Sequence, residues 1–217
     1  MKQNTINYIL YIFVLILVGC TQRNEHSQSG QMEMQLDDHS AHTGMEMEFG
    51  EPADESIYHV NSTWKNQQDH EMSLEDLRGE VQVVAMVYTH CEYACPRILA
   101  DMKRIQQALS ETARQQTNFV IVSIDPQRDT PERLYDFAHE NNLSDDSWTL
   151  LNGSDGDVLE LAALLGVKYK RISDSDFTHS NMITVLNREG EIIHQRKQLS
   201  NDQTGITRAI EVEFSFE

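Results

Sequence analysis

Two cysteines, Cys91 and Cys95, are the residues of this sequence whose spacing most clearly implies chemistry. They belong to the stretch Y-T-H-C-E-Y-A-C-P at residues 88–96, which follows an apolar run and precedes an amphipathic segment. Side chains four residues apart on a helical turn share one face, and their Cα atoms lie about 6 Å apart, within the disulfide range of about 4.4–6.8 Å. The pair can therefore close a disulfide or bind one soft metal ion, and the spacing leaves both open.

The residues around the two thiols narrow these possibilities only in part. The usual redox arrangement has two residues between its cysteines, whereas this pair has three, so the spacing permits redox chemistry without indicating it specifically. Pro96 fits the first turn of a helix, and a helix start lowers the pKa of a nearby thiol and favours the thiolate. Two thiolates are too few ligands for most metals, but with one imidazole they resemble the ligands of copper electron-transfer sites.

The third cysteine, Cys20, lies near the N-terminus after an uninterrupted apolar run at residues 8–18. This run is shorter than the roughly 20 residues that span a membrane and is typical of a signal peptide. The sequence L-V-G-C at residues 17–20 resembles the lipobox of bacterial lipoproteins, in which the cysteine carries a diacylglycerol. We therefore expect a signal peptide at residues 1–19, a lipid on Cys20, and a domain held on the membrane outside the cytoplasm, on the periplasmic side of the cell envelope.

Residues 20–55 are polar and acidic and show no sustained periodicity, so we expect a disordered tether. The tether contains four methionines and two histidines, which are Met32, Met34, His39, His42, Met45 and Met47. Thioether and imidazole groups are copper ligands, so the tether is either a weak copper collector or a solvated acidic spacer. Residues 56–217 then form one domain of ordinary size.

The net charge of the chain is −18, with a pI near 4.7. Binding to phosphate groups requires a basic surface, so we expect no nucleic-acid partner.

The apolar segments at residues 81–88 and 119–124 read as buried strands, joined by a helix that begins near Pro96. A strand–helix–strand order predicts a right-handed parallel crossover, whose functional end is the carboxyl end of its strands. Cys91 and Asp125 both fall at that end. The other expected elements are a peripheral hairpin at 57–65, a short helical turn at 73–79, a helix opened by Thr130 and Pro131, a strand at 148–151, a capped helix at 154–165, an extended segment at 167–171, a polar loop at 172–178, strands at 182–186 and 191–194, and a helix in the tail.

Three sequence blocks in the same order resemble those of the Sco/SenC family. They are T-H-C-E-Y-A-C-P at residues 89–96, S-I-D-P-Q-R-D-T at 123–130, and F-T-H-S at 177–180 followed by L-N-R-E-G at 186–190. The resemblance covers the chain from about residue 58 to the end. It implies an α/β, thioredoxin-like fold with a central mixed sheet flanked by helices, extended here by the N-terminal hairpin.

The resemblance also implies membrane tethering and one copper ion, Cu(I) or Cu(II), bound by Cys91, Cys95 and His179. The family's best-known role is to supply copper to the CuA site of cytochrome c oxidase, or to reduce that site, during assembly. Two positions depart from the family pattern: Thr178 replaces the usual acid before the histidine, and Glu92 stands where proline is frequent. A missing acidic neighbour can alter the basicity of the histidine or metal exchange, but it removes no ligand.

Asp125 and Arg128 have two interpretations, support of the site or partner docking on the one hand and loop structure with helix capping on the other. His90 is adjacent to Cys91, and its side chain is expected to point away from it.

The sequence therefore favours a membrane-anchored copper metallochaperone whose partner is the CuA subunit or another cuproprotein. Two alternatives remain: a thiol–disulfide oxidoreductase in which Cys91 attacks and Cys95 resolves, and a copper-scavenging lipoprotein that uses its tether.

Overall fold

The computed structural model describes residues 54–91, 93–143, 146–174 and 176–215. The predicted signal peptide, Cys20 and the methionine- and histidine-containing part of the tether lie outside the described residues. In the described part of the chain, no helix is both long and apolar enough to cross a membrane.

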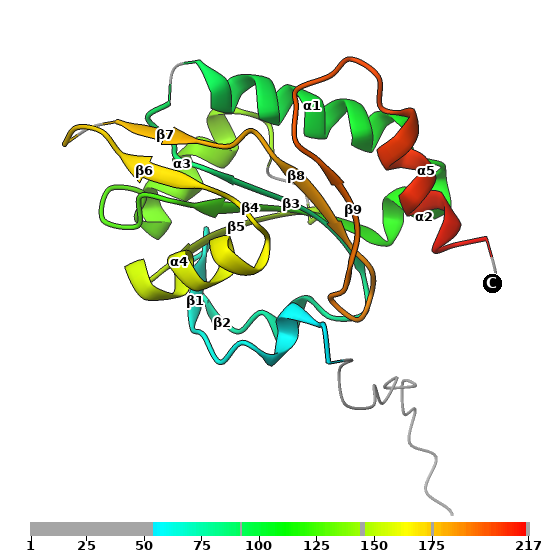
Figure 1. Cartoon of the computed structure of the whole chain (residues 1–217), viewed down its shortest axis with the longest axis horizontal. Coiled ribbons are helices and arrows are strands. Elements are labelled where there is room, and N and C mark those ends of the chain that lie inside the picture. Colours follow the sequence, from blue (N-terminus) through cyan, green and yellow to red (C-terminus); the bar gives the residue numbers. More distant parts are fainter. Residues whose placement is uncertain (1–53, 92, 144–145, 175, 216–217) are drawn as a thin grey trace, which may run out of the picture. The chain divides into compact units, whose positions relative to one another are not determined.

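The centre of the domain is a seven-stranded mixed sheet with the strand order β2-β1-β5-β4-β3-β8-β9 (Figure 1). Its strands are β1 (Trp64–Asn66), β2 (Glu71–Met72), β3 (Val81–Val87), β4 (Thr117–Ser123), β5 (Trp148–Gly153), β8 (Ile183–Leu186) and β9 (Ile192–Arg196). β3, β4 and β5 are parallel to one another, whereas β8 is antiparallel to β3 and β1 is antiparallel to β5. The predicted mixed sheet is confirmed.

β3 and β4 form the core of this sheet because every residue of both strands is buried. Their near-continuous apolar sequences suit strands that are covered on both faces. The register pairs Val81 with Thr117 and Val87 with Ser123, so the two strands end together. The segments that follow them carry Cys91 and Asp125 and consequently leave the sheet side by side, at the carboxyl ends of the two strands.

The helices are α1 (Ala94–Ala108), α2 (Glu111–Gln115), α3 (Pro131–Glu140), α4 (Asp155–Leu164) and α5 (Thr204–Val212). Figure 1 shows α1 above the strands and α4 below them, so helices cover both faces of the sheet. The predicted caps are confirmed: the Thr130 hydroxyl accepts the Arg133 N–H, and Ser154 forms a capping box with Asp157. The helical stripe of α1 is buried, which anchors the helix that carries Cys95.

A second sheet consists of the two antiparallel strands β6 (Tyr169–Arg171) and β7 (Phe177–His179). We call this unit, with the turn between its strands, the β6–β7 hairpin. In the described sheets, β6 and β7 pair only with each other. The hairpin therefore lies against the main sheet without sharing its hydrogen-bond ladder.

Two expectations from the sequence need correction, and one helix was missed. The hairpin expected at residues 57–65 begins later and consists of β1 and β2. Ile57–His59 instead form a 3₁₀ turn, because the Ser56 hydroxyl accepts the Tyr58 N–H and two successive side chains are buried. The expected loop at 172–178 ends in β7, because Phe177 is buried. The short helix α2 was not predicted, whereas the helix in the tail, the 73–79 turn and the other strands are confirmed.

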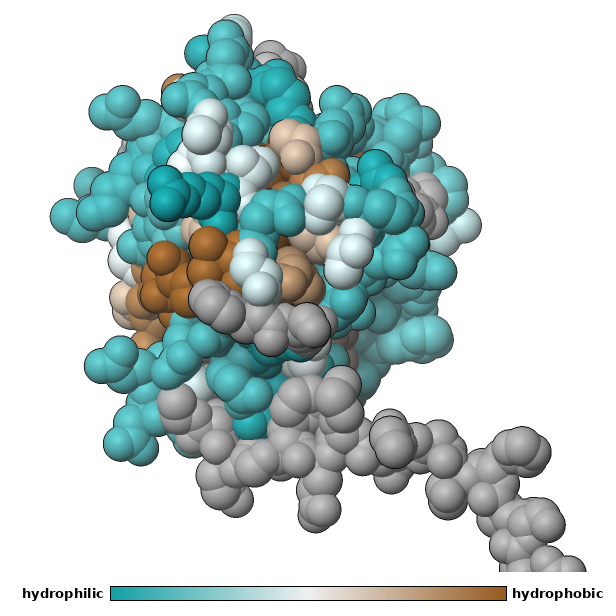
Figure 2. Space-filling view, turned by 90° about the vertical axis from the view of Figure 1, so that its right-hand side faces the viewer, coloured by the Kyte–Doolittle hydropathy of each residue, from teal (hydrophilic) through white to brown (hydrophobic). Residues whose placement is uncertain are grey.

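Figure 2 shows the right-hand side of the domain of Figure 1, the end opposite to the start of α1. Hydrophobic side chains gather there among hydrophilic ones. The exposed apolar residues of β9 and α5 are Ile192 and Val212.

Candidate metal centre

The side chains of Cys91, Cys95 and His179 meet beyond the carboxyl end of β3. One ligand atom from each lies within 4.8 Å of the other two, and no other trio of cysteine, histidine and acidic residues in the described part of the chain is arranged in this way. The Cys95 Sγ and His179 Nε2 are 3.7 Å apart, and the Cys95 N–H donates to the Cys91 Sγ at 3.4 Å. Both cysteines are free thiols. The structure thus brings together the three residues that the sequence selected.

Two elements of the main domain position the thiols. Cys91 follows β3 after a tight turn in which its N–H donates to the Tyr88 carbonyl oxygen at 3.3 Å. Cys95 is the second residue of α1 and only 2% exposed, because it faces the core beside the buried stripe of that helix. Cys91 is half-buried and is therefore the thiol that a partner can reach more easily.

The imidazole comes from the β6–β7 hairpin, where His179 is the last residue of β7 and pairs with Tyr169. The His179 Nδ1 lies 3.3 Å from the Ser180 carbonyl oxygen. An Nδ1–H that donates to this carbonyl leaves the Nε2 lone pair directed at the thiols. Burial lowers the pKa of His179 and outweighs the opposite effect of Ser180, so the ring is neutral and able to bind a metal near pH 7.

The two thiols differ in acidity. Burial raises the pKa of the Cys91 thiol, but hydrogen bonds from the Cys95, Tyr93 and Ala94 N–H groups and from the Cys95 thiol outweigh it, so the net pKa is lowered. Burial raises the pKa of Cys95 far above its usual range, and the nearby charges of Cys91 and Asp129 add to this effect. The expectation that the helix start favours thiolate therefore fails for Cys95, because desolvation is the larger effect there.

Two sulfur ligands and one imidazole suit copper better than other common metals. Thiolates are soft ligands that select Cu(I), and an additional imidazole is also suitable for Cu(II). Structural zinc sites are almost always closed by four protein ligands, whereas this cluster offers three. The donor set therefore fits copper.

A buried carboxylate, Asp129, fixes the chain just before the cysteines. It accepts the Thr89 N–H at 3.0 Å, the Thr89 hydroxyl at 2.6 Å and the Ser123 hydroxyl at 2.6 Å. These bonds join the ends of β3 and β4 beneath the site. Asp129 was not selected from the sequence, although it lies within the second of the three matched blocks.

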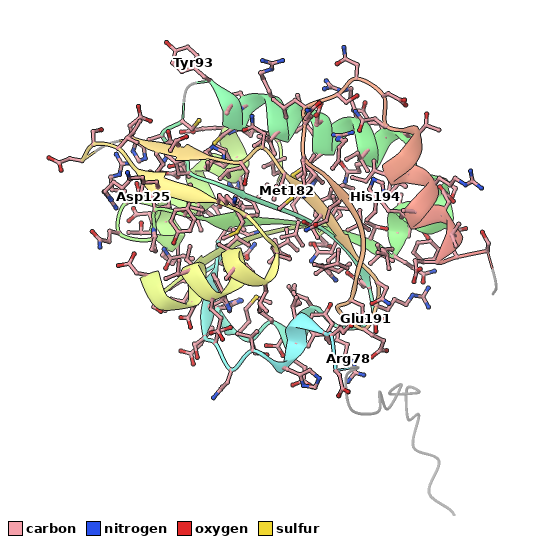
Figure 3. The ribbon with its side chains drawn as sticks, viewed as in Figure 1. Arg78, Tyr93, Asp125, Met182, Glu191 and His194 are labelled. Atoms are coloured by element: carbon pink, nitrogen blue, oxygen red, sulfur yellow. The ribbon has the colours of Figure 1, made fainter. Side chains whose placement is uncertain are left out.

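Asp125 and Arg128 do not reach the ligand cluster. Asp125 is fully buried, and its carboxylate accepts hydrogen bonds from the Arg128 Nε and, at 3.3 Å, from the Arg171 Nη2. Arg171 belongs to β6 and stacks on the Phe177 ring at 4.6 Å. Asp125 therefore fastens the β6–β7 hairpin to the main domain, and Figure 3 shows it beside that hairpin. A docking role for Arg128 stays a prediction.

The neighbours of the ligands point elsewhere. His90 contacts the Thr89 hydroxyl at 3.1 Å and Asp129 at 3.5 Å and is not part of the ligand cluster, in agreement with the sequence. Thr178 is exposed on the opposite face of β7 from His179. Tyr93, between the two cysteines, is 83% exposed and projects from the start of α1 in Figure 3. An exposed aromatic side chain therefore stands beside the more accessible thiol.

Sequence reasoning also missed Tyr88 and Asp176. The Tyr88 hydroxyl donates to the Asp176 Oδ1 at 2.5 Å, and the Tyr88 ring meets the His179 ring edge-on with centroids 5.9 Å apart. These residues are 88 positions apart in the chain, so no local pattern signals their contact.

Comparisons with known proteins agree with the geometry. A sequence model of the SCO1/SenC family matches residues 53–213. The SCO1 protein homolog of Bacillus subtilis (strain 168) is 29% identical over 142 residues, which make up 64% of this chain and 73% of the relative.

Solved structures of the same kind share the fold. BsSco, a member of the Sco family of cytochrome c oxidase assembly proteins in which a disulfide switch was identified, superposes with a TM-score of 0.62 at 26% identity; 71% of this chain and 92% of BsSco are covered. ScoI of Bradyrhizobium japonicum, with copper bound, superposes with a TM-score of 0.60 at 19% identity; 70% of this chain and 96% of ScoI are covered. The expected thioredoxin-like fold is confirmed.

Proposed function

The chain belongs to the SCO1/SenC family, and on that premise we propose that it is a membrane-anchored metallochaperone that binds one copper ion and passes it to a partner protein. Cys91, Cys95 and His179 are the ligands. The observation that carries the proposal is the convergence of two thiols and one imidazole within 4.8 Å from segments far apart in the sequence. A copper-bound relative of the same fold supports the choice of metal.

Each ligand contributes differently to loading and release. Cys91 is the thiol with the lowered pKa and is half-buried, so it supplies the first thiolate and faces the partner. Cys95 is buried and gives up its proton only when copper replaces it, so binding releases a proton and strengthens as pH rises. With three protein ligands the copper ion remains open to a ligand from the partner, which permits transfer by ligand exchange.

The partner we propose is the CuA subunit of cytochrome c oxidase or another cuproprotein of the cell envelope. BsSco belongs to a family of cytochrome c oxidase assembly proteins, which supports this assignment. A lipid on Cys20 would hold the domain on the membrane surface, outside the cytoplasm, where such a subunit exposes its copper site.

A second candidate function, thiol–disulfide exchange, is favoured by the unequal thiols. The Cys91 thiolate attacks one sulfur of a target protein's disulfide and expels the other as a thiolate. The Cys95 sulfur then attacks Cys91, forms the Cys91–Cys95 disulfide and releases the second target thiolate, so the target is reduced and this chain is oxidised by two electrons. An accessible Cys91 of lowered pKa beside a buried Cys95 fits attacking and resolving roles. Copper scavenging by the tether remains a third, weaker alternative.

An anaerobic Cu(I) titration of the reduced full chain tests the proposal. The wild type is expected to bind one copper ion tightly, and His179→Ala to bind it at least about tenfold more weakly, because a ligand is lost. His70→Ala, which removes an exposed histidine from the β1–β2 turn, is the matched control and should leave the affinity unchanged. Equal affinity and stoichiometry in wild type and His179→Ala would contradict a three-ligand site. Retained disulfide exchange in His179→Ala would then favour the oxidoreductase.

A further inference from the structure

The position of His179 depends on a hairpin that the main sheet does not hold. In the described sheets, β6 and β7 pair only with each other, so no ladder of backbone hydrogen bonds fixes the distance between His179 and the two thiols. Side-chain contacts of the hairpin therefore help to set that distance. Metal affinity depends on the distance between His179 and the thiols, because moving a displaced ligand back to the metal costs free energy.

One such contact starts at Tyr88, the residue that follows β3. Tyr88 is 3% exposed, and its hydroxyl donates to the Asp176 Oδ1 at 2.5 Å. The same carboxylate oxygen accepts the Phe177 N–H at 3.1 Å. Asp176 thus connects the end of a core strand to the first residue of β7. A hydrogen bond to a carboxylate is stronger than one between neutral groups.

Tyr88 also touches both sides of the ligand cluster. Its ring packs on Phe177 with centroids 5.3 Å apart and meets His179 edge-on at 5.9 Å; these two residues lie on the same face of β7. Its carbonyl oxygen accepts the Cys91 N–H at 3.3 Å. A displacement of Tyr88 relative to Asp176 would therefore change the separation of His179 from the thiols.

We infer that Tyr88 and Asp176 are a positioning pair that holds His179 within reach of the two cysteines and thereby sets the affinity of the site for copper. The inference rests on the proposed copper site. The Tyr88–Asp176 contact holds β7, whereas the Asp125–Arg171 contact holds β6, so each strand of the hairpin is attached to the main domain by its own side-chain contact. Neither Tyr88 nor Asp176 binds the metal: the hydroxyl proton of Tyr88 is donated to Asp176, and Asp176 is not among the clustered ligands.

Two substitutions remove or weaken the contact with little change in shape. Tyr88→Phe keeps the ring and deletes the hydroxyl. Asp176→Asn keeps the size of an exposed side chain and weakens the acceptor, so this variant folds even if a change at buried Tyr88 is disruptive. Each is expected to raise the dissociation constant for Cu(I) about tenfold, the lower end of the range for groups that orient a metal ligand, because Asp176 is exposed. The double variant should lose no more than Tyr88→Phe alone, since Asp176→Asn weakens only the bond that Tyr88→Phe deletes.

The measurement is competition for Cu(I) between the reduced full chain and a chelating dye, without oxygen. Tyr58→Phe is the matched control: Tyr58 is also buried, and its hydroxyl donates to the Leu77 carbonyl oxygen at 3.3 Å, away from the thiols. Both tyrosine variants are expected to lose some stability of the metal-free protein, but only Tyr88→Phe should lose copper affinity. If Tyr88 had only a general structural role, Tyr88→Phe and Tyr58→Phe would each lower the stability of the metal-free protein and the copper affinity together.

Repeating Tyr88→Phe in the His179→Ala background separates the inference from the proposed function. If Tyr88 acts through His179, the substitution has no further effect once the imidazole is gone. Wild-type affinity in both Tyr88→Phe and Asp176→Asn, or an undiminished effect of Tyr88→Phe without His179, would overturn the inference and leave the copper site intact. A wild type whose affinity does not depend on His179 would overturn the proposed function itself.

Discussion

The Cys95 sulfur lies 3.7 Å from the His179 Nε2, although 84 positions separate these residues in the chain. Cys95 is fixed by a helix of the core and His179 by a separate hairpin. The ligand cluster therefore joins two parts of the fold whose sheets, among the described residues, share no ladder of backbone hydrogen bonds.

The two thiols should react at different rates. The pKa of Cys91 is lowered and that of Cys95 is raised, so at neutral pH the thiolate is concentrated on Cys91. We expect alkylation of Cys91 to be faster by about tenfold or more, since each unit of pKa difference changes the thiolate fraction tenfold. Mass spectrometry of the reduced, metal-free chain after brief treatment with iodoacetamide measures the two rates. Equal labelling would contradict the assignment of Cys91 as the attacking thiol.

Stability should fall at alkaline pH partly because of Cys95. The folded state raises the pKa of this thiol, so the unfolded chain loses the proton first as pH rises above the ordinary thiol pKa of about 8.5. The folded state then binds more protons than the unfolded state, and the free energy of unfolding decreases with pH. Cys95→Ser should therefore lose less stability than wild type between about pH 7.5 and about pH 9.5. Urea unfolding of the reduced, metal-free proteins at both pH values gives the comparison.

Cys91→Ser is the matched control for that measurement. The pKa of Cys91 is lowered in the folded state, so removing this thiol does not relieve the alkaline loss. A slope against pH that is the same in wild type and Cys95→Ser would show that burial of Cys95 does not control its ionisation.

Substitution of Asp125 should loosen the β6–β7 hairpin. Asp125 is fully buried and accepts hydrogen bonds from Arg128 and Arg171, so Asp125→Asn removes a charge that two arginines neutralise. We expect the free energy of unfolding to fall by about 1–3 kcal/mol, the usual cost of losing buried hydrogen bonds to a charged group. Chemical denaturation measures the loss. Asp174→Asn, at an exposed position of the same hairpin, should cost less than about 0.5 kcal/mol.

Membrane attachment is predicted to depend on Cys20 alone among the three cysteines. Cys20→Ser removes the thiol that the lipobox sequence presents for lipid, so the protein should move from the membrane fraction to the soluble fraction of the cell. Metabolic labelling with a fatty acid should fail in the same variant. Cys91→Ser should remain lipidated and membrane-bound. Labelling that persists in Cys20→Ser would exclude the lipoprotein assignment.

Patterns in the sequence predicted most of the fold. The buried strands at β3 and β4, the stripe of α1 and the caps of α3 and α4 depend on neighbouring residues, and local patterning records them directly. The errors have a different origin. The first two residues of β7 fall in the predicted polar loop at residues 172–178, because that segment is mostly polar. The strand conformation of β7 depends on Phe177, which is buried among Tyr88, Tyr169 and Arg171.

The sequence by itself determined which residues can bind a soft metal. Residue types, their order and the three matched blocks select Cys91, Cys95 and His179, because ligand chemistry belongs to the side chains themselves. Only the tertiary structure decided how these residues differ. Burial makes Cys95 a poor acid, and backbone N–H groups make Cys91 a better one. The contacts that hold His179 in place, Tyr88 with Asp176 and Asp125 with Arg171, join residues 88 and 46 positions apart. Desolvation and long-range hydrogen bonds exist only once the chain has folded, so no local pattern can encode them.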